Sequence, residues 1–167
     1  GANVITLSEE QEMLLDTALD FCAKEAPIAN LRGAIQEGLP FDASRWRAMV
    51  DLGWAGIIIP EQYGGLGMSL ADTVPVVESL GRYLVPSPFA AATLAAQTLI
   101  ACGSDTQQSL LLPKLATGVI ASLAIWEPAG SWSLEGTEAT LTQCAHGYQL
   151  NGTKVFVEAG EEADLYL

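Results

Sequence analysis

The pattern of the sequence changes near residue 119, and this change limits the folds that the chain can adopt. Before it, apolar residues recur at the three- and four-residue spacing of amphipathic helices. After it, short apolar or alternating runs separated by turn residues predict strands. We therefore expect an α+β protein, with an all-α helical bundle over residues 1–118 and the first strands of an antiparallel β domain over residues 119–167.

Five helices are expected in the first part, because five stretches carry helical start or stop signals. These signals are a capping residue followed three positions later by Gln, Pro in the first turn, and Gly after the last turn. Pro75 would either kink the third helix or stand in its first turn. The expected helices run from the Ser8 and Gln11 capping box to near Pro27, from Asp42 to Gly53, from Ser69 to Tyr83, from the Ser87 and Pro88 pair through "AAATLAAQTLIAC", and from Asp105 with Gln108 to Gly118.

Strands are expected in "VIASLAIW", in the alternating "TEATLTQC", and in two halves of "YQLNGTKVFV". Asn151 and Gly152 separate these halves and predict a tight hairpin turn. About three or four strands cannot close a sandwich or barrel, because they leave an open edge and half a core. We therefore expect either a fragment of a longer protein or a sheet that something else completes.

The charge balance excludes some classes of partner. The sequence has 20 acidic and 7 basic residues, a net charge of −13, and no Lys or Arg cluster that could follow a nucleic-acid backbone. Nucleic acid and membrane are therefore not expected as partners. The first residues lack a signal-peptide pattern, and the apolar run "PFAAATLAAQTLIACG" is too short and too interrupted to span a bilayer. A cytoplasmic location is expected.

No metal site is expected from the sequence. The three cysteines lie far apart without CxxC spacing, which indicates neither a zinc site nor a disulfide framework. The acidic cluster near the end of the sequence contains no His, and we interpret it as a solvated face. Its members are Glu158, Glu161, Glu162 and Asp164.

Several separated motifs, taken in order, resemble those of the acyl-CoA dehydrogenases. They cover essentially the whole chain and are "LSEEQEMLLDTALDFCAKEAP", "MVDLGWAGIIIPEQYGGLGMS", "LLPKLATG", "AIWEPAGS" and "GYQLNGTKVFVEAGEEAD". The resemblance implies the N-terminal helical domain of that family and the opening of its middle β domain. It also implies a flavoprotein oxidoreductase of lipid metabolism that uses FAD to convert an acyl-CoA thioester into the α,β-unsaturated enoyl-CoA.

The resemblance places the catalytic Glu of the family in a C-terminal part that lies beyond these motifs. We therefore expect no catalytic residue in this chain. The implied partners are the acyl-CoA substrate and further acyl-CoA dehydrogenase subunits, in a homo- or hetero-oligomer.

The resemblance also implies two sets of binding residues. In "AIWEPAGS" and "NGTKVFVEAG", the residues expected at the flavin are Ile125, Trp126, Gly130, Ser131, Phe156 and Glu158. The residues expected at the substrate are Phe89, Thr93, Leu94 and Ser131. From the residues alone, other readings remain open: an ordinary exit from a strand at "IWEPAGSW", a plain core aromatic at Phe156, and core packing for the helical residues.

The sequence departs from the family pattern at its flavin motifs. Trp126 stands where Thr or Ser is usual, one loop residue is missing after Pro128, and Trp132 replaces Asp. Phe156 replaces a Trp, and Glu158 replaces a Thr or Ser. These departures support an alternative, a non-catalytic subunit that pairs with an active homologue. A stand-alone binding or regulatory module is a third hypothesis.

Three further features are interpreted as structural. "PEQYGGLG" lacks the strand–GxGxxG–helix context of a phosphate-binding loop and predicts a turn. Glu127 is expected to hold the loop that follows it rather than to act as a base. His146 is expected in a surface β-turn.

Overall fold

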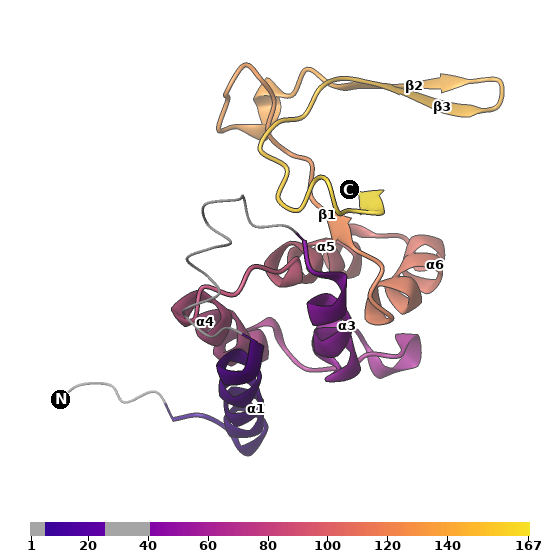
Figure 1. Ribbon diagram of the computed structural model, residues 1–167. Coiled ribbons are helices and arrows are strands. Elements are labelled where there is room, and N and C mark those ends of the chain that lie inside the picture. Colours follow the sequence, from indigo (N-terminus) through magenta and orange to yellow (C-terminus); the bar gives the residue numbers. More distant parts are fainter. Residues whose placement is uncertain (1–5, 26–40) are drawn as a thin grey trace.

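The computed structural model describes residues 6–25 and 41–167, and these form helices followed by short strands (Figure 1). The helices are α1 (Glu9–Glu25), α3 (Ala43–Asp51), α4 (Val74–Arg82), α5 (Phe89–Cys102) and α6 (Asp105–Ala116). The strands are β1 (Ala121–Ser122), β2 (Thr140–Cys144), β3 (Gly147–Asn151) and β4 (Leu165–Tyr166). This order confirms the predicted α+β class. The predicted helix end near Pro27 lies outside the described residues.

The first two predicted helix starts are confirmed by their hydrogen bonds. The Gln11 N–H donates to Ser8 Oγ, and the Ser8 N–H donates to Gln11 Oε1, both at 3.1 Å. Asp42 Oδ1 accepts from the Arg45 N–H at 3.0 Å, which caps α3. Pro75 stands in the first turn of α4 and does not kink it.

Two other predicted starts were wrong by one residue. The fourth helix has Pro88 at its N-cap, and Ser87 Oγ accepts from the Phe89 N–H at 3.2 Å. Ser104, not Asp105, caps α6, in a capping box with Gln107. The reason is that the Gln108 side chain donates to the Gly103 carbonyl at 3.0 Å, so it is held at the end of the preceding helix.

The predicted hairpin turn at Asn151 and Gly152 was also wrong. Strands β2 and β3 pair in antiparallel register, with Cys144 opposite Gly147 and Thr140 opposite Asn151. The turn therefore lies between Cys144 and Gly147 and contains the exposed His146, as expected for that residue. Gly152 instead allows close packing at the base of the hairpin, because a Cβ there would lie 2.6 Å from that of Ala139.

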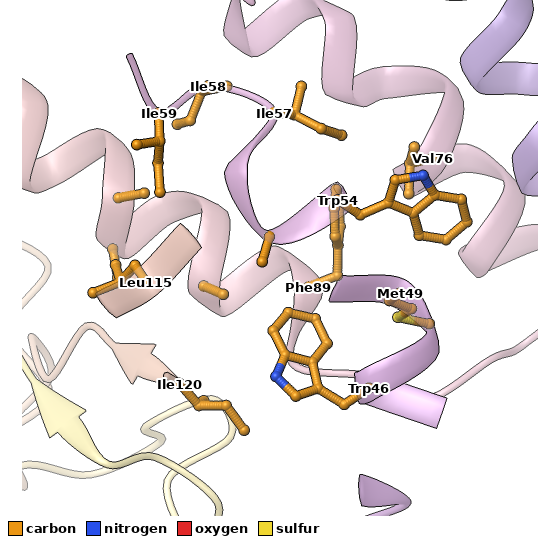
Figure 2. Close-up of a cluster of buried hydrophobic side chains, with 14 of the residues drawn as sticks. Trp46, Met49, Trp54, Ile57, Ile58, Ile59, Val76, Phe89, Leu115 and Ile120 are labelled. Atoms are coloured by element: carbon orange, nitrogen blue, oxygen red, sulfur yellow. The ribbon is translucent and has the colours of Figure 1, made fainter. Parts of the chain in front are cut away.

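The hydrophobic core lies between the helices, and α5 runs through it. Trp54, in a 3₁₀ turn after α3, packs edge-on against Phe21 and Phe89, with ring centroids 5.1 and 6.4 Å apart. Figure 2 shows Trp54 and Phe89 in the same cluster as Trp46. The Trp46 indole N–H donates to the Gly118 carbonyl at 2.9 Å, which ties α3 to the end of α6.

The "PEQYGGLG" segment is a packed turn, as predicted. Backbone N–H groups of Gly64, Gly65, Leu66 and Gly67 donate to carbonyl groups of the same segment or of residues 56–59 just before it. Because these donors are already paired, they have no capacity to hold a phosphate.

Within residues 6–25 and 41–167, no helix combines the length and the apolar character that crossing a membrane requires.

The strands lie outside the group of packed helices. The β2–β3 hairpin projects away from the helices, and β1 lies against α5 (Figure 1).

The two adjacent glycines of the turn predict very different responses to substitution. A Cβ at Gly65 would overlap the Ile59 carbonyl. A Cβ at Gly64 meets nothing within 4 Å, so an alanine there is disfavoured only by the backbone φ of +87°. We expect Gly65→Ala to lower the free energy of unfolding by about 3 kcal/mol or more. Gly64→Ala is the matched control, with an expected loss of about 1–2 kcal/mol. Urea titration measures both, and equal losses would contradict the packing described.

Candidate functional site

The extended segment around residues 120–127 lies between two later parts of the chain. On one side β1 pairs in parallel with β4, with Ala121 opposite Leu165. The Ala124 N–H continues this side by donating to the Leu167 carbonyl at 2.8 Å. The other side faces residues 154–158. The segment is therefore held on both edges by residues far along the sequence.

The two motifs that the sequence analysis assigned to a cofactor lie side by side. The Val155 N–H donates to the Trp126 carbonyl at 2.7 Å. Lys154 Nζ donates to the Ile125 carbonyl at 3.0 Å. Further along, the Ser122 hydroxyl donates to the Glu158 carbonyl. Both carbonyls of the Ile125–Trp126 pair are thus already hydrogen-bonded.

Glu127 is the polar anchor of this arrangement. Its buried carboxylate accepts from the Glu138 N–H at 2.7 Å, the Ala139 N–H at 2.9 Å and Lys154 Nζ at 3.0 Å. These backbone N–H groups first, and then Lys154, lower the pKa of Glu127 from 4.5 to about 2. A carboxylate with its oxygens so occupied holds the loop, as predicted, and is unsuited to act as a base near neutral pH.

A pocket of about 150 Å³ opens beside the paired motifs. It brings together Ile125, Trp126, Phe156 and Glu158 from the expected cofactor set, and Leu94 from the expected substrate set. Its volume is below the roughly 300–1,000 Å³ of complete small-molecule sites, so it can hold a ring or a short apolar group. The lining residues are Ala91, Leu94, Ser122, Leu123, Ile125, Trp126, Phe156 and Glu158.

The side chain of Phe156 is the most exposed of the aromatic groups at this pocket. It is 90% exposed, and its backbone has a φ of +54°, a conformation that a bulky residue seldom adopts. Phe156 is therefore not a plain core aromatic. Non-glycine residues with such backbone strain cluster at binding sites.

The structure does not bring every expected site residue to the pocket. Phe89 is 1% exposed and Thr93 is also buried, so both lie in the helical packing behind it. Gly130 lies in the loop after Glu127, and its N–H donates to the Glu127 carbonyl at 2.9 Å. Ser131 lines a separate hollow of only about 10 Å³, where its hydroxyl bonds to the backbone of Ser133.

The two tryptophans of the loop contact each other. The rings of Trp126 and Trp132 pack edge-on, with centroids 5.2 Å apart, although Trp132 is 88% exposed. Trp126 and its neighbour Ile125 line both the pocket and the small hollow of Ser131, so the two cavities adjoin the same two residues. Trp126 and Trp132, the two loop positions at which the resemblance implies other residues, are therefore adjacent in space.

Sequence reasoning missed several residues of the site. Lys154 was not recognised as a contact of Ile125 and Glu127, and its only signal was a single basic residue in "NGTKVFV". Ala91 and Leu123 line the pocket from α5 and from the segment after β1. An alanine in an apolar helix and a leucine in an apolar run carry no distinguishing pattern.

The backbone of the site offers donors rather than acceptors. Within the described part of the chain, the N–H groups of Ile125 and Trp126 meet no hydrogen-bond acceptor, whereas their carbonyls are both paired.

Residues 8–119 match the family model described as "Acyl-CoA dehydrogenase, N-terminal domain". A relative, the acyl-CoA dehydrogenase IpdE2 of Mycobacterium tuberculosis, is 36% identical over 147 residues, which are 87% of this chain and 45% of that protein. The chain thus spans less than half the length of this curated relative.

Two solved structures have similar folds. An acyl-CoA dehydrogenase from Bacillus anthracis complexed with FAD matches with a TM-score of 0.81 and 27% identity, over 96% of this chain and 28% of that one. The ChsE4-ChsE5 complex from Mycobacterium tuberculosis matches with a TM-score of 0.79 and 25% identity, over 98% and 42% of the respective chains.

The low pKa of Glu127 predicts a pH-dependent loop. Because the folded pKa is depressed, the stabilisation is present above about pH 4.5 and is lost as the pH falls toward 2. Glu127→Gln should reproduce the loss at neutral pH, since an amide cannot accept from both N–H groups and Lys154 equally well. We expect hydrogen exchange at Glu138 and Ala139 to accelerate by roughly tenfold or more.

Glu135→Gln is the control for this experiment, because Glu135 is an exposed carboxylate in the same loop. Its exchange pattern should match that of the unsubstituted protein. Unchanged exchange at Glu138 and Ala139 in Glu127→Gln would show that the carboxylate does not hold the loop.

Proposed function

The chain belongs to the acyl-CoA dehydrogenase family, and on that premise we propose that the protein containing it oxidises an acyl-CoA thioester to the α,β-unsaturated enoyl-CoA with FAD. The chain would supply the helical domain over residues 1–118 and the opening of the β domain over residues 119–167. The catalytic base is assigned to the part of the protein that this sequence does not include.

The observation that carries this proposal is the pairing of the two motifs around one pocket. A flavin presents oxygen and nitrogen acceptors along its pyrimidine edge and at N5, and the N–H groups of Ile125 and Trp126 suit them. The exposed ring of Phe156 suits stacking on a planar ring system. These features fit FAD, which when bound supplies the oxidising capacity for desaturation.

The fit is less good at Glu158. This exposed carboxylate lines the pocket and has only acceptor atoms when ionised, so it does not complement an acceptor-rich edge. We assign Glu158 to the rim of the cofactor site. Gly130 and Ser131 are assigned to the loop beyond Trp126, near the cofactor phosphates and the thioester.

The substrate is assigned to the side of the pocket formed by α5. Leu94 is 47% exposed and lines the pocket, so it is our choice for contact with the acyl group. Phe89, in the hydrophobic core, and the buried Thr93 belong to the same helix and are proposed to support this side of the pocket. Ser131 completes the proposed substrate set from the loop.

A second candidate function is supported by the contact between Trp126 and Trp132. The indole at position 126 replaces a hydroxyl that the resemblance implies at the flavin, and it packs against the second substituted residue. Under this second hypothesis, the protein is a non-catalytic subunit that pairs with an active acyl-CoA dehydrogenase homologue. The similar ChsE4-ChsE5 structure is a complex of two named proteins, which supports a hetero-oligomer.

Flavin content decides between these functions. We expect the full-length protein, purified alone, to release about one FAD per polypeptide on acid treatment and to bleach on addition of an acyl-CoA thioester. Trp126→Thr should retain the flavin, because the proposed backbone donors remain.

The second function predicts the opposite result. The protein alone would carry no flavin, and an active homologue would lose activity when this chain is omitted from the pair. Omission without effect on the homologue's flavin or activity would reject the subunit role.

A further inference from the structure

We propose that Ser122 is a positioning residue, whose hydroxyl holds the segment that carries Phe156 and Glu158 in the shape that the pocket requires. The proposal rests on the proposed function for the nature of the ligand in that pocket. Its basis is the hydrogen bond that the Ser122 hydroxyl donates to the Glu158 carbonyl. Ser122 is 0% exposed, and it lines the pocket together with Phe156 and Glu158.

The segment of residues 156–160 contains two strained residues. Phe156 has a φ of +54° and Ala159 has a φ of +52°, in the left-handed region that residues with a side chain seldom adopt. Such conformations persist only where the surrounding structure holds them. The 156–160 segment therefore depends on its contacts to keep its shape.

Every carbonyl group of residues 157–160 accepts a hydrogen bond. Two of the four donors are backbone groups of the same part of the chain. The Gly160 N–H donates to the Val157 carbonyl at 3.1 Å, and the Ala163 N–H donates to the Ala159 carbonyl at 2.9 Å. These two bonds form the turn itself.

The other two donors are hydroxyl groups of the β1–β4 strand pair. The Ser122 hydroxyl donates to the Glu158 carbonyl, and the Tyr166 hydroxyl donates to the Gly160 carbonyl. These carbonyls belong to the residues immediately before and after the strained Ala159. The two side chains thus hold the backbone on both sides of the strained position.

The backbone of Ser122 is itself fixed by strand pairing. In the parallel β1–β4 pair Ser122 lies opposite Tyr166, and the Ser122 carbonyl accepts from the Leu167 N–H at 2.9 Å. The start of the same pairing is held by Asp164, whose Oδ2 accepts from the Ile120 N–H at 3.1 Å. The hydroxyl is therefore carried by a backbone that is bonded on both sides of residue 121, and it is a fixed anchor for the segment.

Release of the Glu158 carbonyl would change the wall of the pocket. Without this bond, the strained backbone is free to relax from positive toward negative φ, which is the lower-energy region for residues with a side chain. A change of φ at Phe156 redirects its Cβ and therefore its ring. Ser122 would in this way set the position of Phe156, although it carries no group that the proposed function uses.

Two substitutions separate the hydroxyl from the volume of the serine. Ser122→Ala removes the donor with little change in size, and Ser122→Thr keeps a hydroxyl on a side chain that suits a strand. Ser79→Ala is the matched control. Ser79 is 2% exposed, and its hydroxyl also donates to a backbone carbonyl, that of Pro75 at 2.7 Å, but within α4.

The first measurement is hydrogen exchange over residues 156–163 of the full-length protein, followed by mass spectrometry. Ser122→Ala should accelerate this exchange by roughly tenfold, because the Gly160 and Ala163 N–H groups lose their protection when the segment opens. Ser122→Thr and Ser79→Ala should stay near the unsubstituted value. Unchanged exchange in Ser122→Ala, or equal acceleration in Ser79→Ala, would overturn the proposal. No flavin is needed, so the result decides on Ser122 even if the protein carries none.

The second measurement is the FAD affinity and visible spectrum of the same four proteins. A displaced Phe156 ring loses its stacking, so Ser122→Ala should bind FAD roughly three- to tenfold more weakly with an altered flavin band, and Ser122→Thr should restore both. A lower unfolding temperature with unchanged FAD affinity and spectrum in Ser122→Ala would mean a merely structural serine and would overturn the proposal. Absence of flavin from the unsubstituted protein would instead count against the proposed function.

Discussion

The burial of α5 is the constraint on which the rest of the molecule depends. This helix is apolar on nearly all sides and contacts α6, β1 and the 3₁₀ turn of Trp54. Phe89, at its start, packs against Trp54 in the core, while Ala91 and Leu94, further along, line the pocket. One helix therefore joins the hydrophobic core to the candidate site, and displacement of its core side would move the wall of the pocket.

A second, polar constraint holds the other wall. Glu127 and Lys154 are 27 positions apart in sequence, yet their contact brings the two motifs together and anchors the loop between Glu127 and Ala139. Buried charged groups are costly unless they are paired and fully hydrogen-bonded, and here the carboxylate has three donors. The arrangement specifies the path of the backbone beside the pocket that Ile125 and Trp126 line.

The difference between local and long-range information explains which features could be predicted from the sequence. The Ser8 and Asp42 caps depend on neighbouring residues and were predicted correctly, whereas the α6 cap was shifted because Ser104 and Asp105 offer overlapping signals. The hairpin turn was misplaced because strand register, set by pairing along the whole of β2 and β3, overrode the strong Asn-Gly signal. The roles of Lys154 and Leu123 depend on contacts between distant segments, for which a single sequence has no pattern.

The tryptophans of the loop show why backbone and side-chain contacts can change independently. The peptides on both sides of Trp126 are held through their carbonyl groups, by Lys154 and Val155, and these hydrogen bonds do not involve the side chain of Trp126. Replacement of a small hydroxyl by an indole can therefore leave the N–H donors in place while it alters what stands beside them. Here the indole contacts Trp132, and Trp126 lines both the pocket and the hollow of Ser131. Both proposed functions therefore have to account for a serine that lies outside the pocket and for a Trp126 that lines the pocket and contacts Trp132.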